Sequence, residues 1–462
     1  RVKAEILHGQ YGPELVNRFF DTVNLQKGLS KILIDFSTAL LQVIFGLLLL
    51  SVYHPTFILF GIALFVILGL IFYITGPRGM ETAMKESSYK YETAYWLEEI
   101  GRTMNTFKLV GNTRLPILRA DKLLQFYVDF RSKHFAVLIF QYKIMIAFKV
   151  LIVSSLLVAG SLLLINDQIS IGQFVAAEVI IVLVVNSVEK LILSLETVYD
   201  TLVATEKLGH IMDLELENTR GTEKVIVSNP KGLKFGMENV VFHPQDSDHP
   251  ILKGISLTIE PGKKVAVTGK SGSGKSAFLA LLSGLYEEYE GKVMVNDLSI
   301  DMIQLEKYRS MVGDVLEMEQ IFHGTIRENI IVGREYDDKQ LEAVLELVDL
   351  KEYVYQLPND LETKLQPEGK GLSKRIIQSI LVARALIGKP KAIIMENALL
   401  HLYEDVKNRI LDYLIKGDWT LILVTKDEEA IKRVDEIIVM DQGKNVFQGN
   451  HEGYLSFTSN SN

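Results

Sequence analysis

The feature that most restricts how this chain can fold is an apolar stretch at residues 56–75, TFILFGIALFVILGLIFYIT, which contains no charged side chain. A helix rises about 1.5 Å per residue, so this stretch is long enough to cross the hydrocarbon core of a bilayer. Three more apolar stretches accompany it, and together they predict membrane-spanning helices at about 33–53, 56–75, 136–164 and 172–195. A hydrophobic content of 48% and a mean hydropathy of +0.19 agree with a membrane protein.

Three charged residues within or near these spans have two interpretations. Lys143, Glu189 and Lys190 are functional candidates if they lie inside the membrane, where a charge is costly to keep. Alternatively, they lie where the helices have left the lipid, or they pair inside the helical bundle. The sequence leaves both interpretations open.

The basic residues predict the orientation of the spans. The segment 76–134 carries ten lysines and arginines, whereas the short connections 53–55 and 166–173 carry none. Basic residues favour the cytoplasmic side, so the long segment, both ends of the chain and everything after residue 200 are expected in the cytoplasm.

Composition excludes several classes of protein. The net charge is −8 and the isoelectric point about 5.7, which argues against nucleic acid as the main partner, because binding phosphate backbones needs a basic surface. The chain has no cysteine, so disulfides and thiolate metal sites are excluded. It begins with Arg1 and shows no basic-then-apolar leader, from which we expect a chain shortened or processed at its N-terminus.

The character of the chain changes after residue 212. Residues 1–212 are expected to form a transmembrane domain with intracellular loops, and the polar residues 213–232 a linker. Residues 233–462 alternate short β-rich runs, such as KAIIM, with helical ones, such as VKNRILDYLI. This alternation predicts βαβ units and a mostly parallel sheet. The expected architecture is therefore an all-α transmembrane bundle followed by an α/β domain.

The strongest motif is GKSGSGKS, which follows the strand-like KKVAVT and precedes the helix-like SAFLALLSGL. Strand, glycine-rich loop and helix are the context of a phosphate-binding loop, in which backbone N–H groups and a helix N-terminus face the phosphates. The lysine of the motif is expected to reach the β- and γ-phosphates, and the serine after it to ligate Mg²⁺. The predicted ATP-binding residues are Gly269, Lys270, Ser271, Gly272, Ser273, Gly274, Lys275, Ser276 and Ala277.

The segments around this loop resemble one family closely. They are ILKGISLTIEPGKKVAVTGKSGSGKSAFLALLSGLY, IFHGTIRENI, LPNDLETKL, ILVARALIGKPKAIIM and GKNVFQGNHEGYL, in this order. They resemble the nucleotide-binding domain of ATP-binding-cassette (ABC) exporters, and ISIGQFVAAEVII at 169–181 resembles the start of the last transmembrane helix of these exporters. The chain is similar in particular to the fused half-transporters of type I secretion and peptide export.

The resemblance implies a P-loop NTPase domain of ABC type and a chain that works as a dimer, with itself or with another half-transporter. Such half-transporters have six transmembrane helices, of which four are expected here, so that residues 1–30 correspond to the first intracellular loop. Residues 95–101, YWLEEIG, fall where the second coupling helix docks in the family. A solvated amphipathic helix is the alternative for this segment.

Several residues of this chain differ from those that the family has at its catalytic positions. Glu396 stands at the Mg²⁺-holding aspartate and Asn397 at the catalytic glutamate. An amide orients water but cannot accept its proton. Lys426 stands at the switch histidine, where it still supplies a positive charge. The resemblance thus places the catalytic positions at Glu396, Asn397 and Lys426.

The Mg²⁺ ligands implied by the resemblance are Ser276, Glu317 and Glu396, of which Glu317 replaces the glutamine of the Q-loop. Gln320 is an alternative substitute for that glutamine. His243 and Pro244 fall at the position of the adenine-stacking aromatic residue, and His243 is either a stacking residue or part of a surface turn.

The signature motif and the D-loop also differ from the family. The signature reads LSKRI at residues 372–376, with Lys374 and Arg375 in place of two glycines. The D-loop reads LHLY at 400–403 and lacks the usual aspartate. Glu404 and Asp405 are candidates for a shifted catalytic base.

These departures leave open whether the chain hydrolyses ATP. The first hypothesis is a subunit of an ABC exporter that binds ATP and Mg²⁺ and hydrolyses ATP slowly while an unidentified substrate is exported. The second is a pseudo-ATPase half, or a regulatory membrane scaffold, that binds ATP and pairs with an active partner. A different P-loop activity, such as a membrane kinase, is a third. By resemblance, the expected location is the cytoplasmic membrane of a bacterium, with the nucleotide-binding domain in the cytoplasm.

Overall fold

The computed structural model describes residues 1–8, 12–218, 221, 231–244 and 249–461. The chain divides into two compact units, one formed by Gln10–Leu214 and the other by Arg1–Gly9 together with Glu215–Asn462. The prediction from sequence placed residues 1–8 with the transmembrane domain, whereas the structure places them with the second unit. There Val2 forms a β-bridge with Leu216, and Lys3 forms an ion pair with Glu215.

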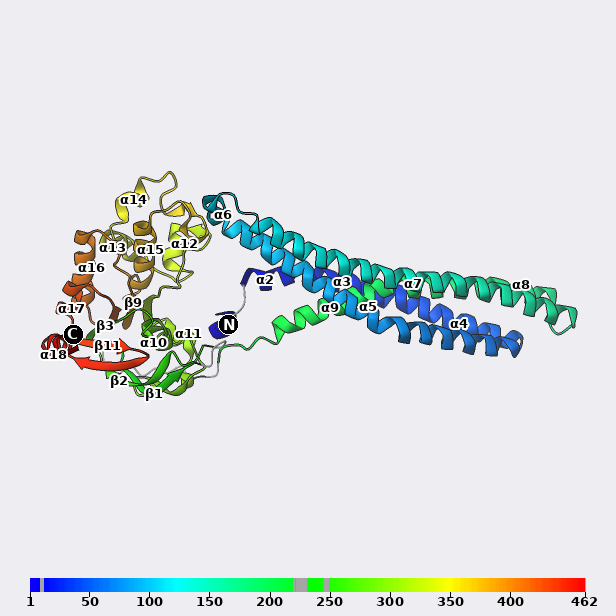
Figure 1. The fold of residues 1–462 in the computed structure, drawn as a ribbon, viewed down its shortest axis with the longest axis horizontal. Coiled ribbons are helices and arrows are strands. Elements are labelled where there is room, and N and C mark those ends of the chain that lie inside the picture. The colour runs from blue at the N-terminus through cyan, green and yellow to red at the C-terminus, as the bar shows by residue number, and fades with distance from the viewer. Residues whose placement is uncertain (9–11, 219–220, 222–230, 245–248, 462) are drawn as a thin grey trace. The chain divides into compact units, whose positions relative to one another are not determined.

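The secondary-structure elements described in the first unit are all helices (Figure 1). Its helices are α2 (Gly12–Asn17), η1 (Arg18–Phe20), α3 (Asp21–Lys31), η2 (Ile32–Phe36), α4 (Ser37–Tyr53), α5 (Thr56–Arg102), α6 (Met104–Val110), α7 (Leu115–Ile165), α8 (Ile171–Leu193) and α9 (Leu195–Met212). Four helical stretches in the described chain are long and apolar enough to cross a membrane, namely Leu15–Tyr53, Thr56–Arg102, Leu115–Ile165 and Ile171–Met212. The four predicted spans fall within them, and residues 95–101 form the end of α5.

The helices of this unit pack through buried apolar side chains and small residues. Val43, Leu64, Met145 and Ile181, from four different helices, are almost completely buried in one cluster. A Cβ added at Gly46 of α4 would lie 2.4 Å from the side chain of Val184 on α8, so only glycine permits the observed approach of these two helices.

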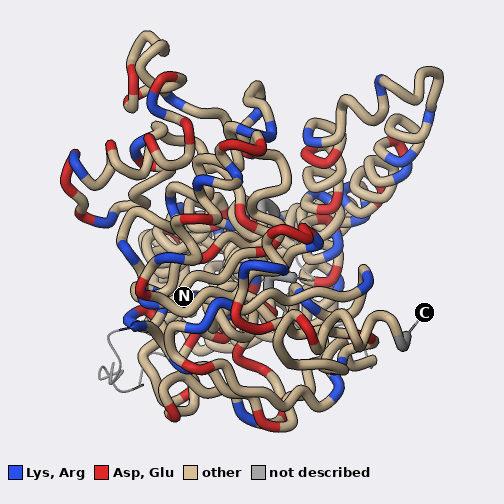
Figure 2. Tube along the Cα trace, turned by 90° about the vertical axis from the view of Figure 1, so that its left-hand side faces the viewer, with Lys and Arg blue, Asp and Glu red and all other residues tan. Residues whose placement is uncertain are grey.

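The charges near the spans are partly explained by pairing between helices. Lys149 of α7 forms an ion pair with Glu189 of α8, with 3.0 Å between Nζ and Oε2. For Glu189, the structure therefore favours pairing between two helices of the bundle. In the view of Figure 2, lysines and arginines are interspersed with aspartates and glutamates, and neither sign of charge forms a large uniform patch.

The second unit is an α/β domain built on three sheets. The largest has the strand order β12-β11-β3-β10-β9-β6, in which β11, β3, β10, β9 and β6 are parallel and β12 is an antiparallel edge. The prediction of a mostly parallel sheet is confirmed. A second sheet, β2-β1-β4-β5, is antiparallel, and β7 pairs with β8.

The bounds of these elements follow the predicted alternation of strands and helices. The strands are β1 (Phe235–Phe242), β2 (Leu252–Ile259), β3 (Lys264–Gly269), β4 (Glu290–Val295), β5 (Leu298–Ser299), β6 (Val312–Val315), β7 (Gly324–Thr325), β8 (Lys364–Leu365), β9 (Ala392–Glu396), β10 (Thr420–Val424), β11 (Glu436–Asp441) and β12 (Lys444–Gly449). The helices are α1 (Ala4–His8), α10 (Lys275–Leu282), η3 (Ile300–Met302), α11 (Leu305–Arg309), α12 (Ile326–Ile331), α13 (Asp338–Leu347), α14 (Lys351–Tyr355), η4 (Asp360–Glu362), η5 (Pro367–Gly369), α15 (Lys374–Leu386), α16 (Glu404–Lys416), α17 (Glu428–Arg433) and α18 (His451–Ser461).

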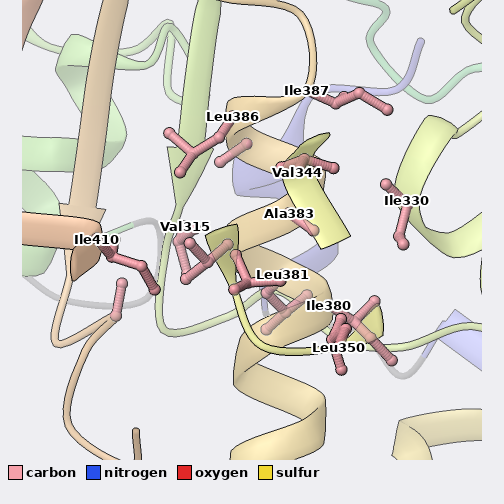
Figure 3. Packing of buried hydrophobic residues seen from close by; sticks show 14 of the residues in the cluster. Val315, Ile330, Val344, Leu350, Ile380, Leu381, Ala383, Leu386, Ile387 and Ile410 are labelled. Atoms are coloured by element: carbon pink, nitrogen blue, oxygen red, sulfur yellow. The ribbon is translucent and has the colours of Figure 1, made fainter. Parts of the chain in front are cut away.

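Strand β9 shows why a continuous apolar run ends at a polar site. Ile393 and Met395 face one apolar cluster, and Ala392 and Ile394 face another on the opposite side of the sheet. Helix α15 contributes to the first cluster, where its residues Ile380, Ala383 and Leu386 lie among the labelled side chains of Figure 3. The strand is thus buried on both faces, and only its C-terminal tip carries polar groups.

Candidate nucleotide-binding site

The loop between β3 and α10 has a backbone that requires glycine at particular positions. Gly269, Gly272 and Gly274 have φ values of +145°, +79° and +97°. A Cβ at Gly269 would lie 2.1 Å from the carbonyl oxygen of Met440, and one at Gly274 would lie 2.8 Å from a methyl group of Leu252. The loop therefore has the backbone turns that direct N–H groups toward an anion.

Lys275 lies along the inner side of this loop. Its Nζ donates hydrogen bonds to the carbonyl oxygens of Gly269 at 3.0 Å and Lys270 at 2.7 Å, and to Ser273 Oγ at 3.2 Å. Partial burial lowers the pKa of Lys275, as does the nearby charge of Lys426, while Glu396 opposes the shift. The ammonium is thus held where a bound phosphate would meet it.

Ser276 and Glu396 form the centre of the site. Ser276 Oγ, in the first turn of α10, donates a hydrogen bond to Glu396 Oε1 at 2.5 Å. Glu396 is the last residue of β9 and is only 6% exposed. A hydroxyl and a carboxylate are hard oxygen ligands of the kind that Mg²⁺ prefers, so this pair fits the ion that accompanies ATP.

A cavity of about 410 Å³ brings most of the predicted site residues together. It is lined by Ile251, Ser271, Gly272, Gly274, Lys275, Ser276, Ala277, Glu317, Glu396, Asn397, Val424, Thr425 and Lys426. Two lysines and two carboxylates therefore face the space where nucleotide phosphates and a cation fit. Glu317 lines this cavity, whereas its alternative, Gln320, does not.

Asn397 adopts a backbone conformation that suits asparagine. Its φ is +51°, in the left-handed region where asparagine is enriched among non-glycine residues. Its N–H donates to the carbonyl oxygen of Val424 at 3.1 Å, and its own carbonyl accepts a hydrogen bond from Gln378 Nε2 at 3.1 Å. The residue is held firmly beside Glu396, but its amide side chain cannot accept a proton from water.

The altered signature segment is held by contacts within its own chain. Ser373 caps helix α15 by accepting a hydrogen bond from the backbone N–H of Ile376. Arg375 approaches Asp349, with 3.4 Å between Nη1 and Oδ2, and its guanidinium lies 5.0 Å from the ring centroid of Tyr403 in the D-loop. The changed signature and the changed D-loop are therefore in contact.

A smaller cavity of about 290 Å³ adjoins the phosphate-loop cavity. Lys374 lines it together with Glu396 and Asn397. Two departures from the family pattern, one at Lys374 and one at Asn397, therefore border the same space.

Some predicted residues are not part of the phosphate-loop cavity. His243 is exposed just after the end of β1 and does not line it, and neither does Pro244. Glu404 forms an ion pair with Lys407 at 2.7 Å and lines a neighbouring cavity, which shares Asn397 and Lys426 with the phosphate-loop cavity. The carboxylate of Glu404 therefore borders the space beside Asn397, where it is engaged with Lys407, whereas Asp405 lines neither cavity.

Sequence reasoning missed a buried carboxylate next to the Q-loop. Glu319 accepts a hydrogen bond from the backbone N–H of Leu316 at 2.9 Å and lies 3.4 Å from Arg384 Nη1. Burial raises the pKa of Glu319 to about 7, and repulsion by Asp314 adds to the shift. Arg384 lies 65 residues further along the chain, so local sequence contained no sign of this pair.

In comparisons with known proteins, a different family model matches each of the two units. The family model described as "ABC transporter transmembrane region" matches residues 11–188, and the model described as "ABC transporter" matches residues 252–399. The chain is 32% identical to the ATP-dependent lipid A-core flippase of Saccharophagus degradans over 258 residues, which cover 55% of this chain and 43% of that one.

A second relative is the transport/processing ATP-binding protein ComA of Streptococcus pneumoniae, with 28% identity over 63% of this chain and 40% of the relative. The chain thus spans less than half the length of these curated relatives. In fold, the chain is similar to a bacterial Atm1-family ABC exporter solved with ATP bound, with a TM-score of 0.85, 21% identity, and coverage of 99% of this chain and 79% of the other. This chain, which joins a transmembrane region to a nucleotide-binding domain, belongs to the ABC transporters.

Proposed function

We propose that this chain is the ATP-binding subunit of a membrane exporter and works as a dimer in a lipid bilayer. The observation that carries the proposal is the convergence of Lys275, Ser276 and Glu396 in one cavity beside the glycine-rich loop. Lys275 contributes the charge for the β- and γ-phosphates, and the other two residues, with Glu317, contribute oxygen ligands for Mg²⁺. ATP binding is then coupled to export through the helical unit.

Hydrolysis in this proposal is slow. A general base typically contributes about 10²–10⁴-fold to the rate, and Asn397 cannot act as one. Within the described part of the chain, two carboxylates line the phosphate-loop cavity, those of Glu317 and Glu396. Both are proposed Mg²⁺ ligands, so neither is available as the base. The chain therefore holds ATP for longer than a fully active ATPase does.

A second candidate function is a pseudo-ATPase half or a regulatory scaffold that pairs with an active partner. It is favoured by Lys374 and Arg375, whose side chains occupy the signature segment where the family has two glycines. In either case the partner is a second half-transporter, identical or different. The proposed location is the cytoplasmic membrane of a bacterium, with the nucleotide-binding domain in the cytoplasm, and the exported substrate is not specified by this site.

The test is equilibrium binding of Mg²⁺-ATP to the full chain in lipid nanodiscs, with AMP as the matched nucleotide. AMP has the same base and sugar but lacks the β- and γ-phosphates. We expect ATP to bind at least about tenfold more tightly than AMP, because the loss of one charge-assisted hydrogen bond to the missing phosphates is enough for that difference. Equal affinities, or no binding of ATP, would contradict the proposal.

A further inference from the structure

The helical unit contains a cavity of about 750 Å³ that the nucleotide site does not use. It lies between α3, α5, α7 and α9 and is lined by Asp21, Asn24, Gln26, Lys27, Gly28, Ser30, Lys31, Ala83, Glu86, Ser87, Lys90, Tyr127, Arg131, Thr197, Asp200, Thr201, Val203 and Ala204. Its size falls in the range of about 300–1,000 Å³ that is typical of small-molecule sites.

The cavity lies beyond the predicted ends of the membrane spans. Lys31 precedes the span expected to begin at about residue 33, and Lys90 lies fifteen residues after the end of the span at residue 75. At about 1.5 Å per residue, Lys90 is about 20 Å from the membrane core, whereas Lys31 is close to the level of the lipid headgroups. The cavity therefore reaches from the headgroup region toward the aqueous side.

Within the described residues, three lysines of the cavity have no ion-pair partner, although the charge of Lys90 acts on Asp200 at longer range. Among the described residues, no carboxylate oxygen lies within 4 Å of the ammonium groups of Lys27, Lys31 or Lys90. Lys27 and Lys31 are one helical turn apart on α3, so their side chains leave the same face of that helix. Lys90 comes from α5 and lies 5.0 Å from the ring centroid of Tyr91.

The carboxylates of the cavity are mostly engaged with other groups. Glu86 forms a close ion pair with Arg131, and its second oxygen is 2.9 Å from His134 Nδ1. Asp21 accepts a hydrogen bond from the hydroxyl of Tyr91 at 2.5 Å.

Asp200 is the remaining carboxylate in the lining. Arg131 is balanced by Glu86, so these two residues add no net charge to the cavity. The three lysines then exceed the two carboxylates of Asp21 and Asp200 in number. The lining residues thus carry one more positive than negative charge, and Glu196 lies close enough to act on both Arg131 and Asp200.

Close packing of α3 against α9 fixes one wall of the cavity. A Cβ added at Gly28 of α3 would lie 1.9 Å from Thr201 Oγ1 of α9, so these two helices are as close as a glycine allows. Both residues line the cavity. Its walls are therefore defined by packed helices.

We propose that this cavity binds an organic anion through Lys27, Lys31 and Lys90, and that the exported substrates belong to this class. The inference rests on the proposed export function. Phosphate, sulfonate and carboxylate groups share the chemistry that three unpaired ammonium groups recognise. The anionic group is either part of a soluble molecule or the headgroup of a lipid.

The test uses the fluorescent anion 8-hydroxypyrene-1,3,6-trisulfonate and the full chain in phosphatidylcholine nanodiscs. Binding is followed by fluorescence anisotropy in a Lys275→Ala background, which weakens anion binding at the phosphate loop. The test variant carries Lys27→Gln, Lys31→Gln and Lys90→Gln. The matched control carries Lys108→Gln, Lys122→Gln and Lys133→Gln, which remove the same charge outside the cavity.

We expect the test variant to bind the probe at least about tenfold more weakly and the control to change by less than about twofold. Equal binding by the two variants would overturn the inference. If the triple variant fails to fold, the double variant Lys27→Glu, Lys31→Glu provides the same comparison, because both side chains are exposed at the surface of α3.

A second arm separates the two sources of the anion. In nanodiscs containing about one fifth phosphatidylglycerol, a headgroup ligand occupies the cavity and abolishes the difference between the test and control variants. A soluble ligand leaves that difference in place. ATP binding is also measured, on the wild type and on both triple variants without Lys275→Ala. A wild type that does not bind ATP contradicts only the proposed function. Equal probe binding by the test and control variants contradicts only the inference about this cavity.

Discussion

Ser276 Oγ donates a hydrogen bond to Glu396 Oε1 across 2.5 Å, joining the first turn of α10 to the tip of β9. The two residues are 120 positions apart in the chain. They meet because β3, which precedes the glycine-rich loop, and β9 lie on either side of β10 in the same parallel sheet, where carboxyl ends share one edge. This contact places a hydroxyl and a carboxylate side by side at the point where a nucleotide-bound Mg²⁺ is expected.

Replacing Lys275 with alanine is expected to weaken ATP binding strongly. The ammonium of Lys275 is held along the phosphate loop, and its removal eliminates the main positive charge facing the β- and γ-phosphates. Affinity should fall by at least about tenfold, as for the loss of one charge-assisted hydrogen bond. The matched control is Lys263→Ala, which removes the same charge from an exposed turn. Unchanged binding in Lys275→Ala would refute the assignment of the loop.

Replacing Ser276 with alanine is expected to weaken ATP binding only when Mg²⁺ is present. The hydroxyl is a proposed ligand of the ion, and within the described part of the chain it hydrogen-bonds to Glu396. ATP affinity should therefore be measured with Mg²⁺ and with a chelator, for the wild type and the variant. The ratio of the two affinities should fall in the variant. An equal loss under both conditions would show that Ser276 acts on the nucleotide or the fold and not on the ion.

Replacing Asn397 with glutamate is expected to raise ATP turnover by up to about 10²–10⁴-fold, since a carboxylate restores a general base. The backbone of Asn397 is left-handed, so glutamate there should cost about 1–2 kcal/mol of stability. Asn397→Gln lengthens the side chain in the same way without adding a base, and its turnover should stay at the wild-type level. If Asn397→Glu also stays at that level, the limiting defect lies at Lys374 and Arg375.

The stability of the nucleotide-binding domain is expected to fall between about pH 5 and pH 7 because of Glu319. Its pKa is raised to about 7, so the folded state holds a proton that an unfolded glutamate, with a pKa near 4.3, has released. The protonated form therefore stabilises the fold fully below about pH 4, and this contribution is lost as the pH rises through about 7. Asp314, whose pKa is also raised by burial, acts in the same direction.

The variant Glu319→Gln isolates this effect, because glutamine does not titrate. Trp419 is buried in the nucleotide-binding domain, and Trp96 is the other tryptophan of the chain. In a Trp96→Phe background, the fluorescence of Trp419 reports unfolding of that domain alone. As the pH rises, the melting temperature should decline more steeply in this parent than in the same chain carrying Glu319→Gln. Identical slopes would contradict a protonated Glu319 in the folded state.

Much of the fold could be predicted because its signals are local. Four long apolar stretches predict spans, and the spacing of GKSGSGKS predicts a strand, a loop and a helix, which the structure has as β3, the glycine-rich loop and α10. The antiparallel sheet β2-β1-β4-β5 was not predicted. Its strand β1 shifts register twice against β2, which interrupts the alternation of apolar and polar residues that identifies a strand.

The parts of the site that escaped prediction depend on distant contacts or on backbone angles. Glu319 is distinguished from Glu317 by its burial beside Arg384, which a sequence does not reveal. The left-handed backbone of Asn397 gives a conformational reason for asparagine that the comparison of motifs alone did not supply. The contact of Arg375 with Tyr403 likewise joins two altered motifs that are 28 positions apart in the chain.

The most direct test of the account is ATP turnover by the full chain in lipid, measured on the same preparation as equilibrium ATP binding. The account predicts saturable binding of Mg²⁺-ATP with turnover well below about 1 s⁻¹, the low end of typical enzymes, because Asn397 cannot accept the proton of the attacking water. Binding with turnover of about 1 s⁻¹ or more would contradict it, and would show that another group serves as the base.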